Sequence, residues 1–161
     1  MFRQMQQGFT LVELMVVISI IGILAMLALP SYQDRIIKTQ VRDGMALADF
    51  VKQGVAAYYT RNQKMPDNNA DAALPPADKI VGNFVTQVAM EQGAITITYG
   101  NRTNGFLSGK KLTLRPAVVE GYPAVPIAWV CGMAQTPNAM KIIGNNQTDI
   151  PLAHLPLDCA K

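Results

Sequence analysis

The sequence predicts an α+β protein, in which one long N-terminal helix carries a small four-stranded antiparallel sheet on its second half. Two observations support this prediction. An uncharged hydrophobic stretch at the N-terminus passes into a pattern of helical period, and a series of short strand-like runs joined by turns follows it. At 161 residues the chain is long enough for one domain with its own core and too short for two.

Apolar residues are concentrated at the N-terminus. Half of the residues are hydrophobic and 16% are charged, against about a quarter in ordinary soluble domains. The net charge of +3 is small and the basic residues are scattered, so the sequence lacks the basic stripe of a nucleic-acid-binding protein.

Residues 9–29 form an apolar run whose only strongly polar members are Thr10, Glu13 and Ser19. As a helix this run would be about 31 Å long, which matches a hydrocarbon core of about 30 Å. We therefore expect residues 9–30 to span a membrane. A secretory signal peptide is the first alternative, but its apolar region is normally shorter, carries no carboxylate and ends in a small-x-small site.

Glu13 is unusual in such a run, because a charged carboxylate deep in the apolar layer costs about 2.5–3.5 kcal/mol. Residues 1–8 form a short polar leader, in which Arg3 favours cytoplasmic retention. Cleavage after Gly8 would free an α-amine on Phe9, and in a neighbouring chain displaced along the helix axis that amine can neutralise Glu13. A plain transmembrane anchor, the second alternative, explains everything except Glu13.

The segment G-FTLVELMVVISIIGILAMLALP, residues 8–30, resembles the type III signal of type IV prepilins. The resemblance implies that a membrane peptidase removes the leader by cutting after Gly8 and methylates the new N-terminal Phe9. It further implies that Glu13 assists docking into a growing filament, and that residues 9–30 form first a transmembrane helix and then the filament core.

The helix is expected to continue as an amphipathic helix over residues 31–61, because apolar residues recur there at steps of three and four. Pro30 removes an intrahelical donor and should kink or loosen the helix, and Gly22 is a second weak point. A simple boundary between two helices at Pro30 is the alternative. The recurring apolar residues are Ile37, Val41, Met45, Ala48, Val51, Val55 and Tyr59.

A loop and a sheet are expected next. Residues 62–80 are rich in Asn, Asp and Pro and predict a surface loop. Four strand-like runs with short links then predict an antiparallel sheet over residues 83–131, which covers the amphipathic half of the helix and gives residues 31–161 the form of one head domain. The runs are residues 83–90, 94–99, 111–115 and 127–131.

Cys131 and Cys159 are the only cysteines, and an even count in a chain with a membrane or export segment favours a disulfide. Two buried free thiols are the alternative. The runs GNFVTQVAMEQGAITITYG, GKKLTLRP and PIAWVCG resemble the sheet of type IVa major pilins, and this resemblance implies that residues 131–159 form a disulfide-closed C-terminal loop.

No residue pattern predicts catalysis, a metal site or a cofactor. His154, the only histidine, is expected on the surface or in a loop, and Trp129 in the core. The N-glycosylation patterns that begin at Asn101 and Asn146 are short enough to arise by chance. A solvated face is favoured over a DNA-binding patch for the basic residues Arg102, Lys110, Lys111 and Arg115.

The resemblance implies the major subunit of a type IV pilus, a homopolymer that serves adhesion, twitching motility, biofilm formation or DNA uptake. Its implied partners are other pilin subunits, the prepilin peptidase and methylase, and the assembly machinery of the inner membrane. Its implied location is the inner membrane before assembly and the extracellular pilus afterwards. A minor pilin, a type II secretion pseudopilin and an anchored binding domain that never polymerises stay open as alternatives.

Overall fold

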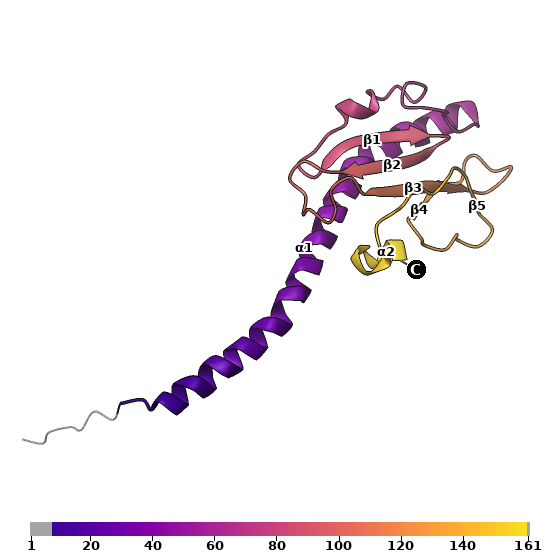
Figure 1. Ribbon diagram of the computed structural model, residues 1–161. Helices are drawn as coiled ribbons and strands as arrows, with labels where there is room; N and C mark the ends of the chain where they lie inside the picture. The colour runs from indigo at the N-terminus through magenta and orange to yellow at the C-terminus, as the bar shows by residue number, and fades with distance from the viewer. Residues whose placement is uncertain (1–7, 161) are drawn as a thin grey trace, which may run out of the picture. The chain divides into compact units, whose positions relative to one another are not determined.

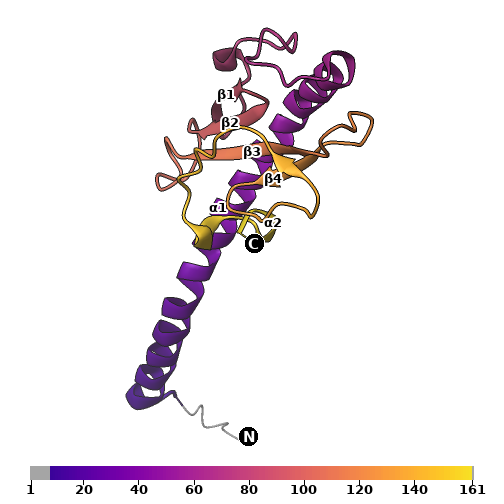
Figure 2. The same cartoon turned by 90° about the vertical axis from the view of Figure 1, so that its right-hand side faces the viewer.

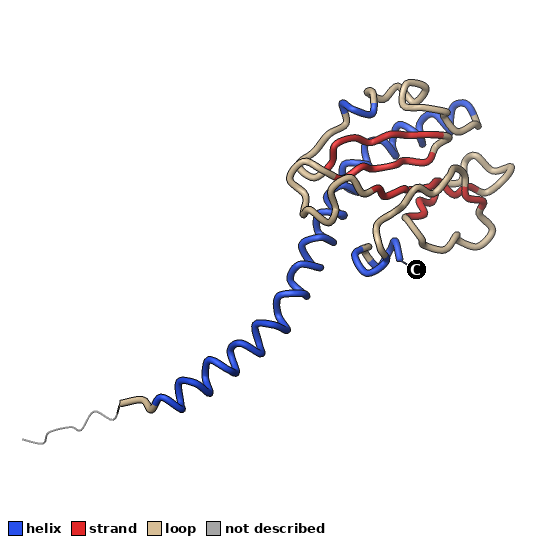
Figure 3. Tube along the Cα trace, in the orientation of Figure 1, coloured by secondary structure: helices blue, strands red, loops and turns tan. Residues whose placement is uncertain are grey.

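The computed structural model describes the backbone of residues 8–160 and the side chains of residues 8–28 and 32–160. Figures 1 and 3 follow its elements along the chain. The chain divides into two compact units, the first ending at Arg35 and the second beginning at Ile36. Residues 1–7 of the predicted leader lie outside the described part.

Helix α1, Leu11–Asn62, runs through both units. All of residues 8–28 are exposed, and an 18-residue stretch of α1 with a mean hydropathy of 2.7 makes the helix long and apolar enough to cross a membrane. Because α1 continues through position 30, the alternative of two helices meeting at Pro30 is wrong. The Pro30 side chain lies outside the described residues, and the kink stays a prediction.

The second unit holds an antiparallel sheet in the order β1-β2-β3-β4, and a short strand, β5, pairs with β3 beyond the end of β2. This confirms the predicted four-stranded antiparallel sheet, whereas β5 was not predicted. The elements after α1 are η1 Ala77–Lys79, β1 Val85–Glu91, β2 Ala94–Tyr99, β3 Lys111–Val118, β4 Ala128–Cys131, β5 Lys141–Ile142, η2 Leu152–His154 and α2 Leu157–Ala160.

One hydrophobic core joins α1 to the sheet, which lies across the helix in Figures 1 and 2. Alternate residues of β2, from Ile95 to Tyr99, are fully buried, as the period of two in a strand requires. The predicted apolar face of α1 is confirmed, because five of its seven residues are buried and Met45 and Tyr59 are partly buried against the same core.

Strand β3 ends at Val118, three residues later than the prediction, which stopped before Pro116. Proline lacks a backbone donor and is disfavoured inside sheets. The Pro116 carbonyl accepts a hydrogen bond of 2.9 Å from the N–H of Ile143. Along this side of β3 the pairing with β2 ends at Leu114 and the pairing with β5 begins at Ala117, so Pro116 lies between the two. The missing donor therefore costs no ladder bond to β2.

Residues 63–80 form the predicted loop, which begins one residue later than predicted because α1 includes Asn62. It is interrupted by the single turn η1 and by a bridge between Asn68 and Glu91. The nearly buried Asn69 fastens this loop to β1. Its Nδ2 donates to the carbonyl of Val88 at 3.2 Å, and its Oδ1 accepts from the N–H of Met90 at 2.7 Å. The loop is thus anchored by the unpaired edge of β1.

Candidate functional site

The first turn of α1 is closed by a reciprocal pair of hydrogen bonds between Thr10 and Glu13. The Glu13 carboxylate accepts the backbone N–H of Thr10 at 3.0 Å and the Thr10 hydroxyl at 2.9 Å. In return, the Thr10 hydroxyl oxygen accepts the N–H of Glu13 at 3.3 Å. This is the capping box of a helix N-terminus, which satisfies donors that have no partner within the helix.

The capping box gives Glu13 a hydrogen-bonding partner within its own chain, which was not predicted. The carboxylate was expected to need a partner from a neighbouring chain. The signal was present in the sequence as Thr-x-x-Glu before an apolar run. Glu13 therefore has two separable properties. Its side chain makes a capping hydrogen bond, which a glutamine side chain also makes, and it carries a negative charge, which a glutamine lacks.

The apolar side chains around this turn are exposed to solvent. Phe9 is 82% exposed, and the other large apolar residues as far as Leu27 are more than two-fifths exposed. A continuous apolar surface of this kind marks contact with a membrane or with other protein chains. Gly22 lies in the middle of it, and a Cβ added there would meet nothing within 4 Å.

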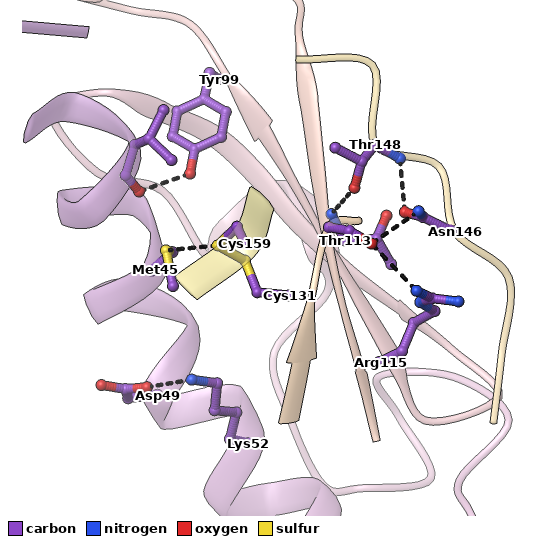
Figure 4. Close-up of a disulfide and its surroundings, with 12 residues drawn as sticks. Met45, Asp49, Lys52, Tyr99, Thr113, Arg115, Cys131, Asn146, Thr148 and Cys159 are labelled. Carbon is purple, nitrogen blue, oxygen red and sulfur yellow. Dashed lines mark hydrogen bonds and ion pairs between the residues drawn. A yellow bond between two sulfur atoms is a disulfide. The ribbon is translucent and has the colours of Figure 1, made fainter. Parts of the chain in front are cut away.

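Cys131 at the end of β4 and Cys159 in α2 form a disulfide, so the predicted pairing is confirmed and the alternative of free thiols is wrong. Figure 4 shows the bond beside α1, where the Sγ of Cys159 lies 3.9 Å from the Sδ of Met45. The carbonyl of Cys159 also accepts the N–H of Met133 at 2.9 Å. The bond thereby holds the C-terminal segment against both the sheet and the helix.

Three of the four basic residues for which a solvated face was favoured over a DNA-binding patch have partners in the head. The Lys110 ammonium lies 4.0 Å from an Asp149 carboxylate oxygen, and Lys111 donates to Gln147 at 3.5 Å. Arg115 donates to the carbonyl of Gly132 at 3.1 Å and is half-buried (Figure 4). These contacts join β3 and the residue before it to the segment that follows β4.

The two N-glycosylation patterns hold structural amides. Asn101 donates through Nδ2 to the carbonyls of Gly82 and Val85, both at 2.9 Å, and Asn146 donates to Gly132 at 2.9 Å. Both amides therefore stabilise loops.

His154 and Trp129 also have structural surroundings. The His154 ring lies edge-on to Phe106, with centroids 4.6 Å apart, and the half-buried Trp129 packs against the core with the Lys52 ammonium 6.0 Å from its ring centroid. Among residues 8–160 the structure has no group of three His, Cys, Asp or Glu side chains that could hold a metal ion.

Comparison with known proteins agrees with this geometry. A family model described as pilin, a bacterial filament protein, matches residues 37–160, and a model of the prokaryotic N-terminal methylation motif matches residues 3–29. The chain is 39% identical to a type IV major pilin protein, PilE1, of Neisseria gonorrhoeae, over 96% of this chain and 87% of that protein.

Two further relatives also match most of the chain. A fimbrial protein of Neisseria meningitidis serogroup B is 35% identical, over 96% of this chain and 94% of that protein. The type IV major fimbrial protein FimA of Dichelobacter nodosus is 37% identical, over 70% of this chain and 81% of that protein. With the family model and the relatives both matching most of its length, the chain belongs to the type IV pilin family.

Proposed function

We propose that this chain is the major structural subunit of a type IV pilus, which polymerises through its N-terminal helix into an extracellular filament. The observation that carries the proposal is an entirely exposed apolar helix, residues 11–28, joined to a folded, disulfide-bonded head. Apolar surface on this scale is stable in a lipid bilayer and then among other helices of the same kind. The helix serves both environments in turn.

Processing precedes assembly. The prepilin peptidase of the inner membrane cuts after Gly8 and methylates the amine of Phe9, as the match to the methylation motif over residues 3–29 supports. Methylation leaves the amine protonated and positively charged at neutral pH. The mature chain thus carries a cation at its first residue and the Glu13 carboxylate four residues later.

Assembly then uses the charge of Glu13. In a filament core the carboxylate leaves water, and an isolated charge there is unfavourable. The Thr10 hydrogen bonds satisfy part of its acceptor capacity, because a carboxylate has about four acceptor sites. The amine of Phe9 from an adjacent subunit supplies the opposite charge, and because this pairing has one geometry it fixes the axial register between neighbours.

The head forms the outer surface of the filament, where attachment, surface motility, biofilm formation or DNA uptake take place. The matches favour a major subunit over a minor pilin or a secretion pseudopilin, because the relatives described above are named as major pilin, major fimbrial or fimbrial proteins. An anchored domain that never polymerises would need neither the leader junction at Gly8 nor the charge of Glu13.

Intact mass spectrometry of filaments sheared from the cell surface tests the proposal. We expect this chain to be the most abundant protein of the sheared fraction, with a mass that begins at Phe9, includes one methyl group and reflects the Cys131–Cys159 disulfide. A chain that remains in the membrane fraction, or whose mass includes residues 1–8, would contradict it.

A further inference from the structure

We propose that a cavity at the C-terminal end of α1 binds an uncharged oligosaccharide. The cavity has a volume of about 750 Å³ and is walled by the last turn of α1, the start of the loop after it, the β1–β2 turn and the segment from β5 to residue 144. This volume lies in the range of about 300–1,000 Å³ that ligand sites occupy. The proposal rests on the head alone and not on polymerisation.

Two glutamines reach this cavity from backbone positions that favour glycine or asparagine. Gln63 follows the last residue of α1 with φ 54°, and its N–H donates to the Tyr59 carbonyl at 2.8 Å. Gln92 occupies the β1–β2 turn with φ 50°. A left-handed residue that closes a helix or a tight hairpin is usually glycine or asparagine. Strained positions of this kind gather at binding sites, and here both carry a long amide side chain to one cavity.

The hydrogen-bonding groups at the cavity suit a ligand with hydroxyls. Gln63 and Gln92 are exposed to solvent and Tyr59 is partly buried, and all three line the cavity, where their amides and hydroxyl are accessible to a ligand. Each amide offers both a donor and an acceptor, and a hydroxyl offers the same. A purely hydrocarbon ligand would cover these groups without satisfying them, at a cost in free energy.

The charged groups at the cavity are already paired, which favours a ligand without net charge. Lys64 lies 3.1 Å from Asp67, and Lys141 lies 2.6 Å from Glu120 on another wall. Two ammonium groups and two carboxylates cancel in sum. Because these charges cancel, the lining offers no net attraction to a charged ligand, whereas a hydroxyl can bond to a carboxylate that keeps its lysine.

An apolar floor and an aromatic wall complete the site. The buried Met65 and Val118 line the cavity, and Tyr59 lines both it and a second cavity of about 360 Å³ that Trp129 also borders. A sugar ring has a C–H face that packs on aromatic rings, while its hydroxyls bond at the edge. A peptide added to the sheet would need an open strand, and β5 has only two residues.

The test uses the full chain in micelles of a detergent without a sugar headgroup, and saturation-transfer NMR with three probes. These are N,N′,N″-triacetylchitotriose, lactose and tetra-alanine. We expect saturation transfer to at least one of the two saccharides and none to the peptide. Replacement of both Gln63 and Gln92 by glycine, which suits their left-handed backbone, should weaken saccharide binding about ten-fold or more.

Gln53→Ala is the matched control, because Gln53 is an exposed glutamine of α1 that does not line the cavity. It should bind the saccharide as the wild type does. Circular dichroism should show a thermal midpoint for the double glycine variant no lower than that of the wild type, because glycine suits the left-handed backbone at both positions. Absence of saccharide binding by the wild type, equal transfer to tetra-alanine, or equal weakening by Gln53→Ala would overturn the proposal. None of these results would affect the proposed role in the pilus.

Discussion

The hydroxyl of Tyr99 in β2 donates a hydrogen bond of 2.8 Å to the backbone carbonyl of Val41 in α1. The ring of Tyr99 reaches the helix because residue 44 is glycine. A Cβ at Gly44 would lie 2.5 Å from Cε1 of that ring. This contact sets how the second half of the helix lies on the sheet.

Gly44→Ala should therefore destabilise the head, although alanine is the better helix former. The gain in helix propensity is about 1 kcal/mol, whereas overfilling a packed core costs about 1–3 kcal/mol. A contact of 2.5 Å places Gly44→Ala in the upper part of that range, about 2–3 kcal/mol. We expect a net loss of about 1–2 kcal/mol in the free energy of unfolding, measured with urea. Gly22→Ala is the control, since its Cβ meets nothing; a Gly44→Ala head as stable as the wild type would contradict the tight contact.

Tyr99→Phe should cost about 1 kcal/mol, because the Val41 carbonyl keeps its helical partner and loses only the hydroxyl. It should also change the pH dependence. Burial raises the pKa of Tyr99 in the folded head, so unfolding releases a proton above the unfolded value of about 10. Stability should thus fall from about pH 10 upward, and less steeply in Tyr99→Phe. Parallel pH profiles of the two proteins would speak against a buried hydroxyl.

Replacement of Cys131 and Cys159 together by serine should lower the free energy of unfolding by about 3.5 kcal/mol. The two residues are 28 positions apart, and the cross-link removes conformational entropy from the unfolded chain in proportion to the logarithm of that loop. Urea unfolding with and without reductant measures the effect. Pilin abundance in the cell should fall in step, and an unchanged midpoint after full reduction would rule out this role.

Asn69→Ala should free the loop of residues 62–80 from β1. The substitution leaves the N–H of Met90 and the carbonyl of Val88 without their side-chain partner, at about 1–3 kcal/mol for each buried group. We expect a loss of about 2–6 kcal/mol and faster proteolysis within the loop. Asn68→Ala removes only an exposed hydrogen bond of 3.1 Å that the Asn68 Oδ1 accepts from the N–H of Asp71 within the loop, and should have a small effect. Equal proteolysis rates for the two variants would contradict the anchoring role.

The periodic parts of the fold were predictable from the sequence. The apolar steps of α1 and the bounds of β2 follow from local pattern, because burial imposes a period of 3.6 on a helix and 2 on a strand. Strand β5 was not predictable, since Lys141 and Ile142 carry no alternation and become a strand only through pairing with β3. The extension of β3 through Pro116 likewise depends on where the neighbouring strands end.

The N-terminal site was also predictable in part, because some of its residues form a local sequence pattern. Gly8, Phe9 and Glu13 belong to a contiguous motif that can be recognised from the sequence alone. The capping box of Thr10 and Glu13 also has a contiguous sequence pattern, Thr-x-x-Glu, although the prediction gave Glu13 a partner from another chain instead. The placement of Gln63 and Gln92 at one cavity could not be predicted from the sequence, because these residues are 29 positions apart and meet only through tertiary folding.

We propose that the charge of Glu13 drives assembly, apart from the part that this residue plays in the capping box. Glu13→Gln separates the two, because a glutamine amide still accepts the Thr10 hydrogen bonds and has no charge. Glu13→Val removes both. Each variant should fold, insert into the membrane and lose its leader, since the head begins many residues later.

The decisive measurement is the yield of sheared filaments from cells whose only major pilin is Glu13→Gln, normalised to membrane-bound protein by immunoblot. We predict a yield as low as that of Glu13→Val, with filaments sparse or absent by electron microscopy. Wild-type filament yield from Glu13→Gln, with loss only in Glu13→Val, would show that the carboxylate acts as a helix cap, and would contradict charge pairing with the amine of Phe9.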